Sequence, residues 1–445
     1  MVREERPLAV QTDGTTLLDR RAWSVSQKLL LGLVSLAILL DGFDNQALGF
    51  ALPSLMKDWG LPKSALGGAL AAAQLGMLIG AISGGVMGDR RGRKLALVVS
   101  VTLFGAATLI IGFAGSPGQL TALRFIAGLG LGAAFPNVAA LAAEFTPARH
   151  RSLAVIISIV CVPLGGVVGG MAASVILPAM GWQALFVLAG GCTLALAVVL
   201  ALVIPESVTF LMCHGASEAR IQRSLRRMGF GESAADKVPL PTSDKPSLPL
   251  AAVLGAEWRT DSLLVWTAFF FSLVSVYAAF NWLPTLLADG GLSVAQAAQG
   301  LAAFNMGGVF AALMAGTTIG RYGSRRVMLA MTMGAAATAA LLAILTRSSM
   351  PLPGMFLLIA VEGGCVNGVQ TSLYALASNI YPAAMRARGV GLATGVGRLG
   401  AIASAFLGAM VVGVLGLSGF HWVIAATMAL VTVTLSLVAR HVPQR

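Results

Sequence analysis

Long runs of apolar residues, separated by short polar connections, follow one another from residue 28 almost to the end of the chain. Each run has about 20 residues or more, the length of helix that crosses a bilayer core of about 30 Å. The pattern therefore predicts transmembrane helices. We predict twelve of them, over residues 28–54, 63–87, 95–115, 118–143, 152–176, 181–204, 262–288, 294–319, 325–346, 352–380, 389–414 and 418–439.

Composition agrees with this pattern. The chain has 445 residues, of which 57% are hydrophobic and 11% are charged, and 53 are glycines. Such a chain is too apolar for a soluble protein and too long for a single span. The first run lacks a small-residue cleavage site and exceeds the apolar region of a signal peptide, so we expect it to be retained.

The positive charge of the chain predicts its orientation. Of the 30 Lys and Arg residues, only Lys57, Lys63 and Arg347 lie in odd-numbered connections, and only Arg124 and Arg398 lie within spans. The others lie in the tails and the even-numbered connections, which places both termini in the cytoplasm. The net charge of +12 therefore does not indicate nucleic-acid binding. The four cysteines are scattered and show no metal-ligand or disulfide spacing.

The chain divides into two six-span halves. We expect a cytoplasmic tail over 1–27, a first half over 28–204, a linker over 205–260, a second half over 261–440 and a tail over 441–445. In the linker, a short helix is predicted after Ser217, with Ile221, Leu225 and Met228 on one side, and Pro-rich sequence follows. Its basic residues could bind lipid, but plain membrane topology explains them more simply.

The two halves repeat each other in sequence. The segment from Leu52 to Leu61 matches the segment from Leu283 to Leu292 at an offset of 231 residues, since both begin Leu-Pro and end with an Asp and a Gly-Leu pair. Parallel repeats of six spans imply a pseudo-twofold axis along the membrane normal. The expected fold class is an all-α membrane protein of twelve helices in two pseudo-symmetric halves, with the substrate at their interface.

Two acids stand in the middle of the first span, in Asp41-Gly42-Phe43-Asp44. A carboxylate at this depth is expensive unless it faces a cavity or a partner. Three residues apart on a helix, the two acids lie on nearly the same face, and both cannot easily stay ionised in low dielectric. We predict that Asp41 and Asp44 couple transport to protons. The alternative is one capped structural Asp and one solvated Asp.

Three more charged residues are predicted inside spans. Arg398 lies roughly 13 Å into span eleven, Arg124 lies nearer the outer side in span four, and Glu362 is near the middle of span ten. An arginine offers a planar fork that binds a carboxylate with two hydrogen bonds. Arg398 and Arg124 are thus candidate substrate ligands, unless each only neutralises Asp41, Asp44 or Glu362. Glu362 either lines the cavity or is tied to a neighbour.

Uncharged polar and aromatic side chains within spans are further candidates to line a substrate cavity. Trp282 could equally be an anchor at the membrane interface. The candidates are Gln74, Asn137, Tyr277, Asn281, Trp282, Asn305, Asn367, Gln370 and Tyr374.

Several motifs resemble a known family. The connection Gly88-Asp89-Arg90-Arg91-Gly92-Arg93-Lys94 resembles the signature loop of the major facilitator superfamily, and its second copy has Gly320 where the first has Asp89. Within that superfamily, Asp41-Gly42-Phe43-Asp44, Trp282 to Leu287 and Gly389 to Arg398 look like the aromatic acid:proton symporters. The resemblance implies a gate at the cytoplasmic side. We expect the gating residues to be Gly85, Asp89, Arg90, Gly92, Arg93, Glu144 and Arg386.

The resemblance implies a function. We expect an inner-membrane carrier that works as a monomer without a cofactor or metal. Its expected partners are a benzoate- or hydroxybenzoate-type anion, protons and membrane lipid. The alternatives are a carrier of another organic anion, such as a dicarboxylate or sugar acid, and a receptor that senses aromatic acids. No nucleophile–base or metal constellation is visible, so an enzyme is not expected.

Overall fold

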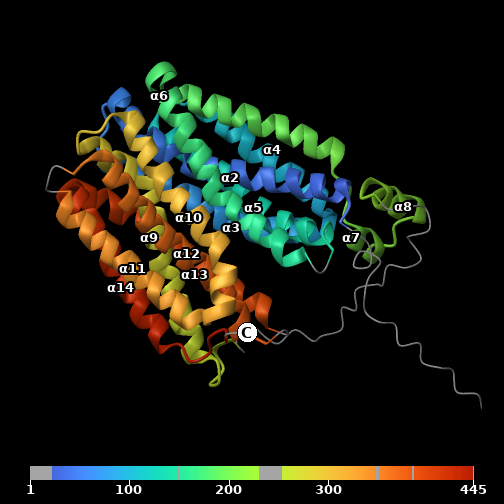
Figure 1. The fold of residues 1–445 in the computed structure, drawn as a ribbon. Helices are drawn as coiled ribbons and strands as arrows, with labels where there is room; N and C mark the ends of the chain where they lie inside the picture. The colour runs from blue at the N-terminus through green and yellow to red at the C-terminus, as the bar shows by residue number, and fades with distance from the viewer. Residues whose placement is uncertain (1–22, 148–149, 230–252, 347–349, 383–384, 444–445) are drawn as a thin grey trace, which may run out of the picture.

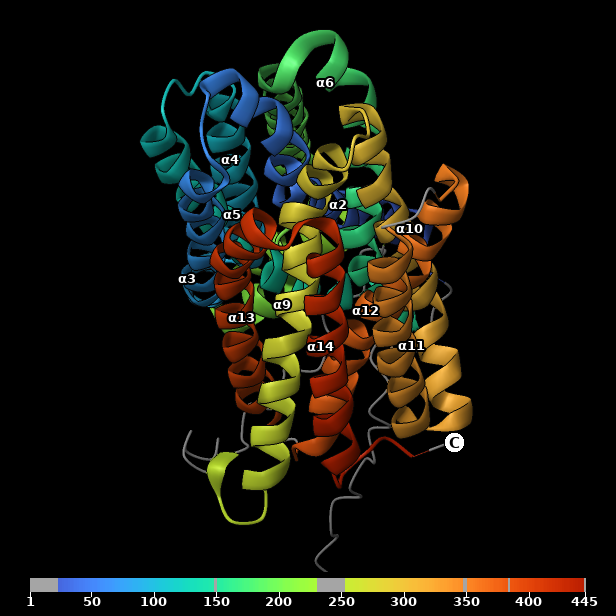
Figure 2. The same cartoon turned by 90° about the vertical axis from the view of Figure 1, so that its left-hand side faces the viewer.

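The computed structural model describes residues 23–147, 150–229, 253–346, 350–382 and 385–443. In this part of the chain all regular elements are helices, and they form two bundles side by side (Figures 1 and 2). The first bundle consists of α2 (Val25–Trp59), α3 (Gly67–Arg91), α4 (Arg93–Ile111), α5 (Pro117–Glu144) and α6 (Arg151–Val203). The second consists of α9 (Arg259–Asp289), α10 (Val294–Tyr322), α11 (Ser324–Leu345), α12 (Leu352–Ile380), α13 (Arg386–Val414) and α14 (Gly416–Leu437).

Eleven helices of the described part are long and apolar enough to cross a membrane, and α6 accounts for two spans. It has 53 residues, about twice the length that one span needs. Its backbone leaves the helical region at Gly181, where φ is 80° and ψ is 175°, and the ribbon turns back at the end of the bundle (Figure 2). The prediction of twelve helices in two halves is thereby confirmed.

Three short elements connect the spans. The 3-10 helix η1 (Lys63–Leu66) joins α2 to α3, and α7 (Val208–Cys213) and α8 (Glu218–Arg227) follow α6. The short helix predicted after Ser217 is confirmed as α8, whereas α7 was not predicted. Leu225 and Met228 are buried against the first bundle, and the Ser24 hydroxyl at the start of α2 donates to the Met228 carbonyl at 3.2 Å. The predicted Pro-rich stretch lies outside the described residues.

The two bundles are inclined to each other, as Figure 1 shows. We call the end with α7 and α8 the linker end and the opposite end, where η1 lies against α13, the η1 end. Buried apolar side chains of the second half join those of the first half toward the η1 end in one cluster, whereas those of the first half toward the linker end form a cluster of their own. An ion pair between Lys63 and Asp289 also joins the halves at the η1 end.

Two glycines on α2 mark its closest contacts. A Cβ on Gly42 would lie 2.2 Å from the carbonyl oxygen of Val162, on α6 of the same half. A Cβ on Gly49 would lie 2.0 Å from the carbonyl oxygen of Phe280, on α9 of the other half. Glycine lets the backbones approach this closely in lipid, where helices associate by close packing. The helix that carries both acids is therefore held against both halves.

Candidate functional site

Four polar residues of α2, Asp41, Asp44, Asn45 and Gln46, are buried at the contact between the halves. Successive residues of an α-helix point about 100° apart, so this short segment presents polar groups to several neighbouring helices. Asp44, Asn45 and Gln46 have hydrogen-bond partners on other helices. We describe two sites, one around Asp44 and one around Asp41.

The first site lies within the first half and belongs to Asp44. Its Oδ1 accepts a hydrogen bond of 2.5 Å from the Thr108 hydroxyl on α4. Arg124 on α5 places Nη1 3.4 Å from Asp44 Oδ2 and donates to the Asp44 carbonyl at 3.2 Å. Both Asp44 and Arg124 are 1% exposed. The arrangement is an almost fully enclosed ion pair in which each charge neutralises the other.

The second site lies between the halves and belongs to Asp41 and Arg398. Asp41 is buried, and its Oδ1 has no hydrogen-bond partner in the described part of the chain. Arg398, on α13 of the second half, is only half-buried, and its charge acts on Asp41. Within the described ranges, no carboxylate oxygen lies within 4.0 Å of the Arg398 guanidinium. The Asp41 carboxylate and the Arg398 guanidinium can thus each form a further hydrogen bond or ion pair.

Arg398 is held in place by neutral groups from both halves. Its Nη1 donates to the Tyr277 hydroxyl on α9 at 2.7 Å and to Gln74 Oε1 on α3 at 3.2 Å. Gln74 in turn donates to Asn45 Oδ1 at 3.3 Å, and Asn45 donates to the Tyr277 hydroxyl at 3.2 Å. The four side chains therefore form a closed ring of hydrogen bonds that links α2 and α3 to α9 and α13.

A second polar contact joins the halves beside this ring. Asn305 on α10 donates to Gln46 Oε1 at 2.7 Å, and Gln46 Nε2 donates to Asn305 Oδ1 at 3.3 Å. Paired amides of this kind satisfy each other in a buried environment. Asn305 thus lies at the interface of the halves, but its amide is already used.

The remaining candidates of the second half occupy different places. Asn281 is buried on α9, where its amide nitrogen has no partner among the described residues. The charge of Arg398 acts on Tyr374 of α12, one turn from the buried Gln370. Asn367 donates to the backbone carbonyl of Gly363 at 2.9 Å.

Trp282, Asn137 and Glu362 lie within the packed interiors of the halves. Trp282 is fully buried, and a Cβ on Gly408 would lie 2.2 Å from its ring, so the side chain is not at a membrane interface. Asn137 donates to the carbonyls of Gly84 and Ala133 between α3 and α5, at 3.0 and 2.8 Å.

Glu362 is tied to a neighbour. Its Oε1 lies 3.1 Å from His421 Nδ1 on α14, and both side chains are fully buried. The structure brings Glu362 together with neither Arg398 nor Arg124 by a hydrogen bond or ion pair in the described part of the chain.

The predicted gating residues gather at the linker end. Asp89 forms an ion pair with Arg93 one turn later, while Arg90 is exposed. Gly85, on the same helix as Asp89, faces open space, since a Cβ there would meet no atom within 4 Å. Gly92 ends α3 with φ of 107°.

The other two gating candidates come from different helices. Glu144, at the end of α5, accepts a hydrogen bond of 2.8 Å from the Ser207 hydroxyl. Arg386, at the start of α13, donates to the Tyr381 carbonyl at 3.4 Å.

Sequence reasoning missed Asn45, Gln46 and Thr108. The signal for the first two was present, because they extend the polar run that starts at Asp41 in an otherwise apolar helix. Thr108 had no such signal, since its hydroxyl can bond to its own helix backbone and a threonine within a span attracts no attention. Within the described residues, no group of three His, Cys, Asp or Glu side chains could hold a metal ion.

Comparisons with known proteins bear on the whole chain. The model of the Major Facilitator Superfamily matches residues 34–346 and 265–445. The chain is 36% identical to the gallate transporter of Pseudomonas putida over 91% of this chain and 90% of that one. It is 35% identical to the 4-hydroxybenzoate transporter PcaK of Pseudomonas aeruginosa, over 92% and 91% of the two chains. The fold also matches the xylose transporter XylE of E. coli in a partially occluded inward-open conformation, with a TM-score of 0.74 and 17% identity over 94% of this chain and 99% of that one.

Proposed function

The chain belongs to the Major Facilitator Superfamily, and from this premise we propose that it imports an aromatic carboxylate together with a proton by alternating access. Members of this superfamily are transporters, not enzymes. The proposal concerns the substrate, the coupling ion and the movement.

The observation that carries the proposal is the unpaired guanidinium of Arg398 between the halves. It is half-buried and oriented by Tyr277 and Gln74, and no carboxylate of the described residues is bonded to it. A guanidinium in this position binds an external carboxylate with two parallel hydrogen bonds. Arg124 does not offer the same site, because Asp44 occupies it. We therefore assign the substrate carboxylate to Arg398.

Aromatic acids fit the surroundings of Arg398 and the similarity to known transporters. Tyr374 stands near its charge and offers a ring face and a hydroxyl group, whereas the ring and hydroxyl of Tyr277 hold Arg398 itself. Gln370 and Asn281 add amide groups that could bind a ring hydroxyl. Two relatives with about 35% identity over most of the chain are named as gallate and 4-hydroxybenzoate transporters, which supports a hydroxybenzoate-type substrate here.

Asp41 is our candidate for the coupling proton. It is buried with one carboxylate oxygen unsatisfied, and its cationic neighbour is the group assigned to the substrate. When a substrate carboxylate neutralises Arg398, Asp41 loses part of its compensation and takes up a proton. Asp44 has its own counter-charge in Arg124 and supports the helix, so we place coupling mainly on Asp41.

The arrangement of the halves suggests how access alternates. The halves share a core and the Lys63–Asp289 ion pair at the η1 end, while at the linker end a Cβ on Gly85 would meet no atom within 4 Å. The distribution of Lys and Arg supports an orientation in an inner membrane with the linker end and both termini on the cytoplasmic side. In that orientation, the contacts at the η1 end support an inward-facing state for this arrangement of the halves. Approach of the halves at the linker end, near Asp89 and Arg93, gives the outward-facing one.

Uptake by proteoliposomes tests the proposal. Labelled 4-hydroxybenzoate should accumulate when the outside is more acidic than the lumen, and counterflow should occur without a gradient. A competition panel of benzoate, hydroxybenzoates, gallate, short dicarboxylates and sugar acids identifies the substrate class. Competition by dicarboxylates or sugar acids alone contradicts an aromatic substrate. Binding without counterflow contradicts a carrier and indicates a receptor.

A further inference from the structure

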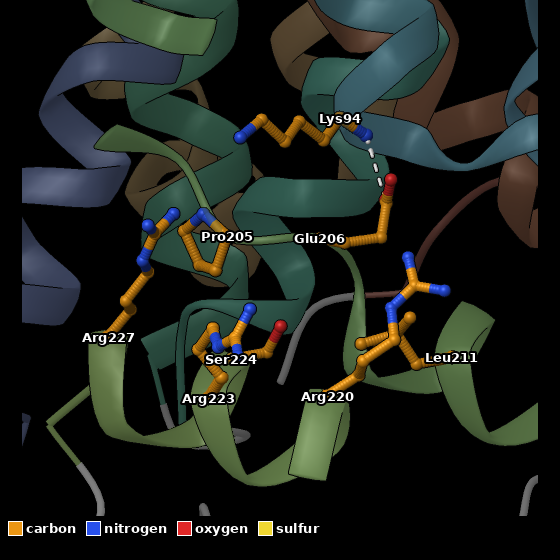
Figure 3. A pocket seen from close by; sticks show the side chains of 8 residues that line it. All are labelled: Lys94, Pro205, Glu206, Leu211, Arg220, Arg223, Ser224 and Arg227. Atoms are coloured by element: carbon orange, nitrogen blue, oxygen red, sulfur yellow. Dashed lines mark hydrogen bonds between the residues drawn. The ribbon is translucent and has the colours of Figure 1, made fainter. Parts of the chain in front are cut away.

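A basic pocket of about 290 Å³ lies at the linker end of the first half (Figure 3). It is formed by the start of α4, the segment that follows α6, and one face of α8. Lys94 comes from α4, and Arg220, Arg223 and Arg227 follow one another along α8 at intervals of three and four residues. That spacing places the three arginines on one side of the helix.

The four cations of this pocket form no close ion pair with a carboxylate in the described part of the chain, since no carboxylate oxygen there lies within 4.0 Å of their charged nitrogens. Glu206 is the one acid that lines the pocket, and its Oε1 accepts hydrogen bonds of 2.9 Å from the backbone nitrogens of Lys94 and Ser207. The Glu206 carboxylate is thus engaged in holding the start of α4 to the segment after α6.

Two of the cations also repel each other. Figure 3 shows the amino group of Lys94 extending toward the side of the pocket where the Arg227 guanidinium stands. The like charge of Arg227 acts on Lys94, and the opposite charge of Glu206 offsets part of it. Juxtaposed cations destabilise a fold unless an anion lies between them. Helix α8 is nevertheless anchored, because Leu225 and Met228 are buried in the first bundle. The three arginine side chains themselves are exposed.

The pocket lies where lipid-facing surface ends. Leu95 and Val99, which follow Lys94 on α4, are large exposed apolar residues, and so are Leu202 and Val203 at the end of α6. In a protein that spans a membrane, such exposed apolar side chains contact acyl chains. A group held between α4, α6 and α8 is therefore at the depth of lipid headgroups, and it is also open to water.

We propose that this pocket binds a phosphate group, carried either by an anionic phospholipid or by a soluble phosphate compound. Arginine forks and a lysine together provide the donors and the charge that a phosphate requires. Basic pockets at the cytoplasmic side of transmembrane helices bind lipid headgroups in the same way. The bound phosphate would neutralise Lys94 and Arg227 and fix α8 against the first half. This site lies outside the transport pathway proposed above and does not depend on it.

Lipid retention by the purified full chain tests this site. The protein is incubated with equal amounts of phosphatidylglycerol and phosphatidylcholine, and native mass spectrometry measures the bound lipid. Wild type should retain phosphatidylglycerol preferentially. The double variant Arg223→Gln/Arg227→Gln should lower that retention roughly a hundredfold, since each of the two lost charge-assisted hydrogen bonds to the phosphate weakens binding about tenfold. Lys94→Gln, on a different helix, should lower it in the same direction.

A matched control removes the same charge elsewhere. Arg259→Gln/Arg326→Gln neutralises two exposed arginines of the second half and should leave retention unchanged. Titration of lipid-depleted protein with inorganic phosphate separates the two sources. Phosphate binding that needs Arg223 and Arg227, without selective lipid retention, assigns the site to a soluble phosphate compound. Equal lipid and phosphate binding by wild type, the site variants and the control overturns the proposal.

Discussion

Asp41 and Asp44 stand one turn apart on the same helix, yet they occupy opposite kinds of site. Asp44 faces its own half, where Arg124 and Thr108 enclose it. Asp41 has an unsatisfied oxygen, and the cation that acts on it belongs to the other half. In the proposed alternating-access movement, a pair inside one half moves as a unit, so the compensation of its charges is constant. When the compensating cation belongs to the other half, as for Asp41, the compensation changes with the distance between the halves.

The difference between the two sites predicts that one affects mainly the stability of the fold and the other mainly transport. A buried ion pair that loses one partner costs several kcal/mol, because a charge remains without compensation. A charge that is compensated only in one arrangement of the halves instead favours that arrangement. We therefore expect changes at Asp44 and Arg124 to affect mainly folding, and changes at Asp41 and Arg398 to affect mainly coupling and binding.

The largest expected effect is the loss of coupling in Asp41→Asn. The neutral amide cannot exchange a proton, so accumulation driven by a proton gradient should be abolished, while counterflow of labelled substrate persists. Both are measured in proteoliposomes. Glu218→Gln, which removes an exposed acid of α8, is the control and should accumulate substrate normally. Gradient-driven accumulation at the wild-type level in Asp41→Asn would show that the proton binds elsewhere.

Next in size is the destabilisation of the fold by Arg124→Leu. Asp44 then keeps a buried charge without its partner, which should cost about 3–5 kcal/mol of unfolding free energy. Chemical unfolding in detergent measures it. The double variant Asp44→Leu/Arg124→Leu has no uncompensated charge and should recover most of the loss. If the single and double variants are equally unstable, the ion pair does not explain the role of Arg124.

A smaller effect is expected for Arg398→Lys, in binding and not in stability. The ammonium keeps the charge but cannot form two parallel hydrogen bonds with a carboxylate, so substrate should bind roughly ten- to hundredfold more weakly. Affinity is measured on the purified variant, and its unfolding should match wild type. Near-normal affinity would mean that the carboxylate is bound by another group.

The smallest effect should come from Tyr277→Phe. The change removes one hydroxyl from the ring that holds Arg398, at a cost of about 0.5–1.5 kcal/mol, or roughly two- to tenfold in affinity. The same binding measurement detects it. Tyr322→Phe, an exposed tyrosine at the end of α10, provides the control. An affinity loss as large as that of Arg398→Lys would place the tyrosine hydroxyl in direct contact with substrate.

Much of the fold could be predicted because membrane helices can be recognised in a sequence by the length and apolarity of their residue runs. The twelve runs matched helices, and Ser24 and Ser293 begin α2 and α10 with reciprocal side-chain hydrogen bonds to Gln27 and Gln296. The fifth and sixth spans were predicted separately, and the structure divides them at Gly181, where the backbone of the nearly continuous helix leaves the helical region.

The site could be predicted only as a set of residues. A charged or amide side chain within a span signals function or pairing, so Asp41, Asp44, Arg124 and Arg398 were all evident. Which acid meets which arginine depends on the rotation of α2 and on how α5 and α13 approach it. Those are tertiary properties, and spacing along one helix does not contain them. The partner of Glu362, His421, lies 59 residues away on α14 and was not predicted for the same reason.

An added methyl group has different consequences at two glycines of α2, Gly42 and Gly49. An added methyl at Gly42 presses on α6 in the same half, so it strains every conformation of the carrier alike. An added methyl at Gly49 presses on α9 in the other half, so it penalises only the conformations in which the halves meet at the η1 end. A penalty confined to one state shifts the population toward its alternative. Gly49→Ala would thus act as a conformational bias, whereas Gly42→Ala would act as a general packing defect.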